Sequence, residues 1–397
     1  MRGSMTENAT VVGKEKEIAQ SVLLNNKTTE SEKSALNTLF AQRDSLEFVE
    51  FIDGLRENFR TGTSVILQGG VGIGKTSIAI EIGKYEKRNI YVFHFARHSA
   101  TDSVITYIDN NGVMRNAINE DFKKAFTDAK GIVIIDEIDK ADPQMLNIML
   151  SVLYERTFEG IVLAKSTAII ATCNQQYDRN SITLGQAGIT RVCYVDMDSL
   201  LKDMDTNNIY YKYWMRYVAH ERNIDSRIVS FLSLEKNASY LYKTTEDVMQ
   251  FSVPRTWELL SNNIDWLLRI KNNIVKQMFA DGYIGADAAT HFIEFVELYL
   301  DMPDAEKLLD NYAQCNILTI EKKVIAIDVV ASYINKHPQR VYDGVKMIHE
   351  QMKSDELMYL FTLQIKDNKE VIREIQKSNN MKLLKTILQL KSLSNDE

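Results

Sequence analysis

The sequence predicts an α/β fold in which a parallel sheet, flanked by helices, is followed by two helical regions. Short runs rich in Val and Ile alternate with amphipathic stretches from residue 36 to residue 197, a pattern typical of a parallel sheet covered on both faces. Beyond residue 198 helical periodicity replaces the strand pattern. At 397 residues the chain exceeds the size of a single hydrophobic core, so we expect several packed units.

The predicted strands are apolar runs without polar alternation, as expected for strands that are buried on both sides. They cover residues 64–67, 90–95, 132–135 and 167–171. A helix is expected between the third and fourth strands. Asp142 is a favoured N-cap residue, and Pro143 directly after it is favoured at the first helical position.

Four segments follow from these patterns. We expect a tag remnant and extension at residues 1–35, the α/β core at 36–197, a helical lid at 198–271 and a helical C-terminal region at 272–397. The opening residues Met1-Arg2-Gly3-Ser4 resemble a vector-derived tag, which places the expected native start at Met5.

Composition predicts a cytoplasmic protein without a membrane segment. No apolar run approaches the roughly 18 residues of a membrane span, and a signal-peptide pattern is absent at the N-terminus. Cys173, Cys193 and Cys315 are too few and too scattered for a disulfide framework or a zinc cluster, so we expect them to be packing residues. The net charge of −7 gives no general attraction to nucleic acid.

A phosphate-binding motif follows the first predicted strand and opens a helix, which is the context that this motif requires. It fits the pattern G-x-x-x-x-G-K-[ST] with residues Gly69, Gly70, Val71, Gly72, Ile73, Gly74, Lys75 and Thr76. The glycines allow the backbone N–H groups to approach phosphate oxygens closely. Lys75 is expected to reach the outer phosphates of ATP, and Thr76 to ligate Mg²⁺.

Acidic and amide side chains close the third and fourth predicted strands. Asp136 and Glu137 follow the apolar run 132–135, and Asn174 follows the run 167–171 after a short polar stretch. We expect Asp136 to hold Mg²⁺ and Glu137 to polarise the water that attacks the γ-phosphate. Asn174 is the candidate to hold that water beside Glu137, although an Asn at a strand end is often a turn residue.

The order of these motifs, followed by Pro254 and Arg255, resembles Walker A, Walker B, sensor 1 and sensor 2 of AAA+ ATPases over roughly residues 40–271. Segments 136–141, 153–156 and 252–258 are similar to the MoxR-like, dynein-related branch. The resemblance implies that Arg255, on the lid, contacts the γ-phosphate of its own chain. It also implies an arginine that reaches the neighbouring subunit's site, for which Arg191 is the first candidate and Arg179 the second.

The family further implies a ring, expected to be a hexamer, that hydrolyses Mg-ATP to remodel or activate a protein partner in a chaperone-like manner. Such partners often carry a metal-adhesion or metallopeptidase-like module. Two alternatives stay open: a nucleic-acid motor or loader, which the acidic charge disfavours, and a nucleotide-switch scaffold that does not hydrolyse ATP. ATP is expected over GTP because the sequence has no Asn-Lys-x-Asp motif.

Two further segments attract attention. Residues 104–114 predict a hairpin with an Asn-Gly turn. By the resemblance it faces the ring pore, where Tyr107, Ile108, Val113 or Met114 could grip a substrate, and an ordinary surface hairpin is an equal alternative. The aromatic residues at 210, 211, 213, 214 and 217 have helical spacing, so we expect them to pack inside the lid rather than to stack on bases.

Overall fold

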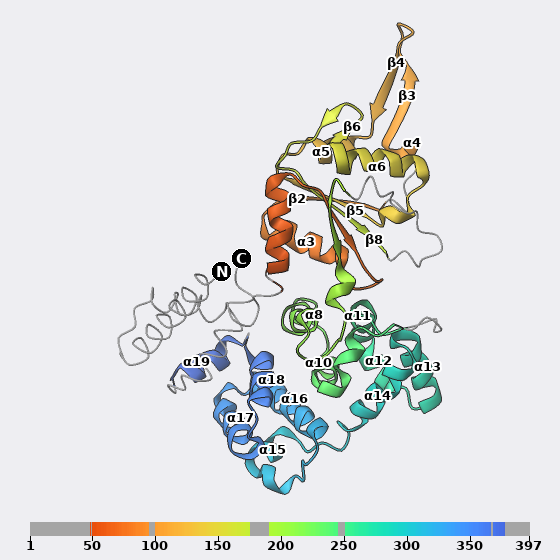
Figure 1. The fold of residues 1–397 in the computed structure, drawn as a ribbon. Helices are drawn as coiled ribbons and strands as arrows, with labels where there is room; N and C mark the ends of the chain where they lie inside the picture. Colours follow the sequence, from red (N-terminus) through yellow and green to blue (C-terminus); the bar gives the residue numbers. More distant parts are fainter. Residues whose placement is uncertain are drawn as a thin grey trace, which may run out of the picture. The chain divides into compact units, whose positions relative to one another are not determined.

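The computed structural model describes residues 48, 50–94, 100–174, 190–244, 251–366 and 368–377. The described residues form two compact units. The larger unit comprises residues 47–303 and 317–328, and the smaller unit includes residues 304–316 and the chain from residue 329 onward. The larger unit contains the sheet and every motif described above that lies in the described residues (Figure 1). Arg179 lies outside the described residues.

The central sheet has five parallel strands in the order β2-β5-β8-β1-β9. Their bounds are β1 Val65–Gln68, β2 Asn89–His94, β5 Gly131–Asp136, β8 Ala168–Cys173 and β9 Cys193–Asp196. The first four match the predicted strands to within two residues at each end. Strand β9 was not predicted, because it lies half-buried at the sheet edge and its short sequence has no continuous apolar run.

All five carboxyl ends lie at one edge of the sheet, because the strands are parallel. Strand β1 is held between β8 and β9, with Gln68 in register with Cys173 and with Asp196. At the other side of the sheet, His94 of β2 is in register with Asp136 of β5. The loop after β1 is therefore surrounded by the ends of its neighbours.

Helix α3 (Lys75–Tyr85) covers one face of the sheet. A Cβ atom on Gly83 would lie 2.9 Å from side-chain atoms of both Ile90 and Ile132, so the helix backbone approaches β2 and β5 closely. Residues 50–61 form a further helix, and Arg56 on it donates to Glu86 at the end of α3 over 2.9 Å.

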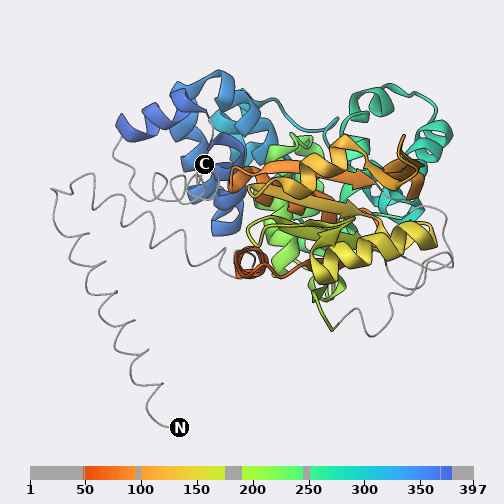
Figure 2. The same cartoon turned by 90° about the horizontal axis from the view of Figure 1, so that it is seen from above.

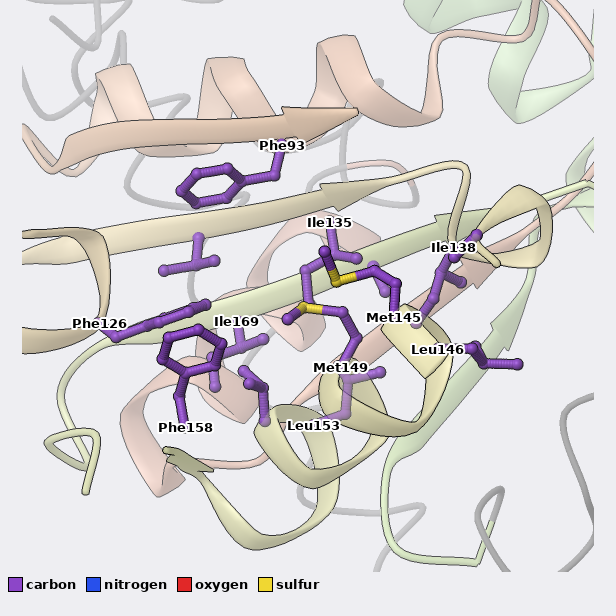
Figure 3. Close-up of a cluster of buried hydrophobic side chains, with 14 of the residues drawn as sticks. Phe93, Phe126, Ile135, Ile138, Met145, Leu146, Met149, Leu153, Phe158 and Ile169 are labelled. Atoms are coloured by element: carbon purple, nitrogen blue, oxygen red, sulfur yellow. The ribbon is translucent and has the colours of Figure 1, made fainter. Parts of the chain in front are cut away.

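Helices α5 (Glu120–Thr127) and α6 (Pro143–Glu155) build the hydrophobic core together with the sheet. Figure 3 shows Met145, Met149 and Leu153 of α6 directed towards Ile135 of β5 and Ile169 of β8. Both views place α6 alongside the sheet (Figure 1, Figure 2). As predicted, the Asp142 side chain caps α6 by accepting from the backbone N–H groups of Gln144 and Met145, and Pro143 is the first helical residue.

The predicted hairpin is confirmed as β3 (Val104–Ile108) and β4 (Met114–Ile118), which project from the sheet (Figure 1). Its turn is set by Asp109, whose carboxylate accepts from the backbone N–H groups of Asn111 and Val113, and by Gly112 at φ 76°. The short helix α4 (Ala100–Ser103) precedes the hairpin, and a second small hairpin joins β6 (Thr157–Phe158) to β7 (Ile161–Val162).

Helices follow the sheet in the larger unit. They are α8 Ile209–Tyr213, continued as a π-helical turn at Trp214–Val218, α9 Ala219–Glu221, α10 Ser226–Ser233, α11 Pro254–Ser261, α12 Ile264–Arg269, α13 Asn273–Ile284 and α14 Ala286–Glu297. Phe231, Trp257 and Phe292 are buried in contact with one another. Tyr210, Tyr211 and Trp214 are also buried, which confirms that these aromatic residues pack internally.

The smaller unit is also helical in its described part. It contains α15 Ala305–Asn311, the second half of α16 (Ile320–Lys336) from Val329 onward, α17 Val341–Lys346, α18 Asp355–Ile365 and α19 Lys369–Lys377. A Cβ atom on Gly344 would lie 2.6 Å from Ile334 and 3.0 Å from Phe361, so α17 packs closely on these helices. The segment boundaries predicted at residues 197 and 271 stay predictions. Across the described ranges, no helix combines the length and the apolar character needed to cross a membrane.

Candidate active site

The phosphate-binding motif forms the connection between β1 and α3, as predicted. Gly72 and Gly74 have φ angles of 79° and 85°, a region that residues with a side chain rarely adopt. Helix α3 begins at Lys75, so its first N–H groups and its positive end face this loop. The loop has the backbone properties of an anion-binding site.

Lys75 lies buried under this loop. Its ammonium donates to the carbonyl oxygens of Gly69 and Gly70, each over 2.8 Å, and to Asn174 Oδ1 over 3.2 Å. Burial lowers the pKa of Lys75 below its ordinary value, although nearby acidic groups oppose this effect. The structure thus joins two predicted site residues, Lys75 at the start of α3 and Asn174 directly after β8.

Asp136 is held by three side chains at the end of β5. Its Oδ1 accepts from the hydroxyls of Thr76 over 2.5 Å and Thr172 over 2.6 Å, and its Oδ2 lies 2.9 Å from His94 Nδ1. Burial raises the pKa of the Asp136 carboxyl, but the hydrogen bonds from Thr172 and Thr76 and the neighbouring His94 outweigh burial and lower it. The group is therefore a carboxylate at neutral pH.

Glu137 follows Asp136 in a left-handed backbone conformation, with φ 53° and ψ 50°. Residues other than glycine adopt this conformation rarely, and it is often found where function demands it. The backbone N–H of Glu137 donates to the hydroxyl of Thr172 over 3.0 Å. At Glu137 the backbone therefore leaves the extended direction of β5.

Asn174 is buried directly after β8 and is 8% exposed. Its backbone N–H donates to Asp139 Oδ1 over 3.3 Å, while its side-chain oxygen faces Lys75. Asp139 is itself buried, and burial raises the pKa of its carboxyl above the ordinary value. The segment after β5 and the end of β8 are thus linked by hydrogen bonds at two places, through Thr172 and through Asp139.

The region after β9 contacts the phosphate-binding loop from its other side. Asp198 Oδ1 accepts from Gly70 N–H over 2.8 Å, and the Tyr210 hydroxyl donates to the Ile73 carbonyl over 2.6 Å. Arg255, in the first turn of α11, donates its backbone N–H to the Gly72 carbonyl over 3.3 Å. The Arg255 side chain is exposed and begins beside the loop, while its contact with a γ-phosphate stays a prediction.

Arg191 is exposed and lies on the opposite edge of the sheet from the loop of its own chain. It precedes β9, whose first residue, Cys193, donates its N–H to the Ser64 carbonyl at the start of β1. Because Cys193 is in register with Val65, Arg191 lies at the amino ends of the strands, whereas the phosphate-binding loop follows the carboxyl end of β1. The geometry therefore does not bring Arg191 to the nucleotide site of the same chain.

Sequence reasoning did not single out Thr172, His94, Asp198 or Tyr210 as site residues. His94 is the next-to-last residue of the predicted strand 90–95, so the rule that parallel strands end at one edge could have found it. Thr172 lies in the run that leads to Asn174, but nothing in that run distinguishes it from a buried strand residue. Asp198 and Tyr210 had no signal, because their partners in the loop are 128 and 137 positions away.

The donor set fits a magnesium ion. Magnesium prefers oxygen ligands, and the Thr76 hydroxyl and the Asp136 carboxylate lie 2.5 Å apart beside the phosphate-binding loop. In the described part of the chain, no group of three or more His, Cys, Asp or Glu residues could hold a metal alone. Cys173 is also buried here, and burial raises the pKa of its thiol to about 12, so it is an inert packing residue.

Comparison with known proteins identifies a domain within the chain. The family model described as AAA domain (dynein-related subfamily) matches residues 64–187. No curated protein matched the sequence significantly. Among solved structures, the Holliday junction branch migration motor RuvB of Thermotoga maritima is 13% identical with a TM-score of 0.35, covering 78% of this chain and 91% of that chain. NtrX of Brucella abortus in complex with ADP is 14% identical with a TM-score of 0.34, covering 86% and 74%.

The close contact between Gly72 and the start of α11 predicts that a side chain at residue 72 destabilises the protein. A Cβ atom on Gly72 would lie 2.7 Å from Val253 Cγ2, whereas one on Gly112, at a similar positive φ, would meet nothing within 4 Å. Gly72→Ala and Gly112→Ala share the backbone strain, and only the former overpacks this contact. We expect Gly72→Ala to be less stable than Gly112→Ala by a further 1–3 kcal/mol or so in urea unfolding.

Adding Val253→Ala to Gly72→Ala removes the overlapping methyl group, so a double-mutant cycle should show favourable coupling between the two changes. Equal stabilities of the two glycine variants, or strict additivity in the cycle, would contradict the close contact between the loop and α11.

Proposed function

We propose that the chain is an AAA+ ATPase, built on the AAA domain (dynein-related subfamily) matched at residues 64–187, and that it works as a ring that remodels or activates a protein partner in the manner of MoxR-like proteins. One observation carries the proposed site: Lys75 bonds to Asn174 after β8, and the adjacent Thr76 bonds to Asp136 at the end of β5. Such convergence suits phosphoryl transfer, which needs positioning and charge stabilisation more than covalent chemistry.

Lys75 and the loop residues 69–74 bind the nucleotide phosphates in this proposal. The Lys75 ammonium turns from the Gly69 and Gly70 carbonyls towards the outer phosphates of ATP, and backbone N–H groups of the loop hold the inner phosphates. Thr76 and Asp136 hold Mg²⁺, which when bound neutralises charge on the phosphate oxygens. Because Asp136 is a carboxylate at neutral pH, it needs no deprotonation before it serves as a ligand.

Glu137 is the proposed general base. It follows Asp136 directly and would orient and polarise the attacking water, while Asn174 supplies an amide that can hold the same water. The contact of 3.2 Å between Asn174 Oδ1 and Lys75 Nζ supports this role, since Lys75 is the residue expected at the γ-phosphate. Arg255 would then bring the lid to that phosphate, because its backbone already contacts Gly72.

Arg191 is proposed to act on the neighbouring subunit. It is exposed and lies across the sheet from its own nucleotide loop, so a role at a phosphate requires the site of another chain. A contact in which one subunit completes the site of the next is heterologous, and such contacts close into a ring. We propose six subunits, the count that the resemblance to this branch implies.

Exposed apolar side chains support self-assembly. Ile274 and Met278 on α13 are 73% and 67% exposed, and Trp266 of α12 packs edge-on against Phe279 with both rings partly open to solvent. Exposed apolar side chains on two neighbouring helices are typical of an interface surface. In this proposal the surface is covered in the ring, and the partner protein, with a metal-adhesion or metallopeptidase-like module, binds elsewhere.

Glu137→Gln tests the proposed reaction. It keeps the size of the side chain but removes the base, so we expect ATP binding to persist while hydrolysis falls by about 10²- to 10⁴-fold. Hydrolysis and particle mass should be measured together across a range of protein concentrations, with Glu120→Gln on α5 as the control. A wild-type monomer that binds ATP without turnover would instead support a scaffold that does not hydrolyse ATP.

Mixing two inactive variants tests the role of Arg191. Arg191→Ala alone should lose about 10³- to 10⁵-fold in rate, the usual contribution of an arginine supplied by a neighbour. Lys75→Ala cannot bind nucleotide but keeps Arg191, so mixing the two variants should restore part of the activity. Lys75→Ala mixed with Glu137→Gln should restore none. An Arg191→Ala variant with full activity alone would transfer the proposed role to Arg179.

The β3–β4 hairpin is the proposed substrate contact. Ile108 and Met114 are 70% and 71% exposed at its tip, and Tyr107 is 47% exposed. Tyr107→Ala with Met114→Ala should leave basal ATP hydrolysis unchanged but remove its stimulation by an unfolded protein such as casein. Val162→Ala, at an exposed apolar residue on β7, is the matched control. Stimulation by duplex DNA in place of casein would indicate a nucleic-acid motor.

A further inference from the structure

Thr172 contacts both acidic residues of the proposed site. It lies on β8, is 1% exposed, and follows Ala171, which is in register with Ile135 of β5. Its hydroxyl is 2.6 Å from Asp136 Oδ1 and 3.0 Å from the backbone nitrogen of Glu137. A single buried hydroxyl therefore joins the end of β5 to the end of β8.

The direction of both hydrogen bonds follows from the chemistry of the groups. A backbone N–H can only donate, so the Thr172 oxygen accepts from Glu137. A carboxylate can only accept, so the single hydroxyl hydrogen of Thr172 goes to Asp136. The Thr76 hydroxyl donates to the same Asp136 oxygen over 2.5 Å. These bonds form one chain from Thr76 through Asp136 and Thr172 to Glu137.

This chain has two consequences for the site. The hydroxyls of Thr76 and Thr172 both donate to the Asp136 carboxylate and orient it. Because Thr76 uses its hydrogen in this bond, the lone pairs of its oxygen stay available to a cation. At the same time, the bond to Thr172 satisfies the N–H of Glu137 in its left-handed conformation. Because threonine is branched at Cβ, its side chain has few rotamers, and the hydroxyl is held in one place.

We propose that Thr172 is a positioning residue for ATP hydrolysis, one that orients Asp136 towards magnesium and Glu137 towards the attacking water. This inference rests on the proposed roles of Asp136 and Glu137. Thr172 itself does not contact the nucleotide in this proposal and acts through its two neighbours. Residues that orient metal ligands in this way typically contribute about 10- to 100-fold to metal affinity or activity.

Thr172→Val tests the proposal, because valine keeps the shape of threonine and removes the hydroxyl. We expect kcat to fall by about 10- to 100-fold. We also expect the Mg²⁺ concentration needed for ADP to stabilise the protein against thermal unfolding to rise by a similar factor. Thr172→Ser, which restores the hydroxyl, should keep both quantities within about threefold of the wild type.

Thr167→Val is the matched control. Thr167 is also fully buried and lies just before the amino end of the same strand, where its hydroxyl donates to the Asp128 carbonyl over 2.9 Å. It lies at the opposite edge of the sheet from the site, so its loss affects stability without affecting the Mg²⁺ requirement. A Thr172→Val variant whose kcat and Mg²⁺ requirement match those of Thr167→Val overturns the proposal.

A second pair of variants tests the role of Thr172 if Thr172→Val does not fold. Thr172→Ala and Thr172→Ser differ only in the hydroxyl, so equal kcat and equal Mg²⁺ requirement for these two variants would also overturn the proposal. Glu137→Gln, measured alongside, separates this failure from that of the proposed function. If Glu137→Gln hydrolyses ATP normally, the proposed function fails. If it is inactive while Thr172→Val is not, only the role of Thr172 fails.

Discussion

Parallel pairing of β1 with β8 and β9 is the constraint on which the site depends, because it places the ends of these strands around one loop. Lys75 after β1 can meet Asn174 after β8 only when both strands run in the same direction. Antiparallel pairing would separate the two residues by the length of a strand. The core beneath, where Ile135 and Ile169 pack against α6, keeps the strand ends in register.

Burial explains why the polar groups of the site have few alternative hydrogen-bond partners. Lys75, Asp139 and Thr172 are 8%, 3% and 1% exposed, and a buried polar atom without a partner is costly. Lys75 donates to Asn174 and to its own loop, and Thr172 donates to Asp136 on β5. Asp139 Oδ2 is an exception, since it has no hydrogen-bond partner among the described residues. An unsatisfied group of this kind is often found where a protein performs its chemistry.

The phosphate-binding loop is contacted by residues from the turn after β9, from α8 and from α11. Asp198, Tyr210 and Arg255 each hydrogen-bond to the loop backbone, although they are far from it in the sequence. Closely packed interiors transmit small displacements instead of absorbing them. These contacts give a direct physical route by which a change at the phosphates reaches α8 and α11.

The sequence by itself determined the features whose geometry is local. Glycines at positive φ, the Asp142 cap and the apolar runs that form β5 and β8 each depend on neighbouring residues, so the loop, the acidic pair and four strands could be predicted. Tertiary structure decided the rest. Strand β9 is stabilised by pairing with β1 and not by an apolar run. Thr172 became a site residue only when β8 was placed beside β5, because hydrogen bonds between distant residues depend on strand order.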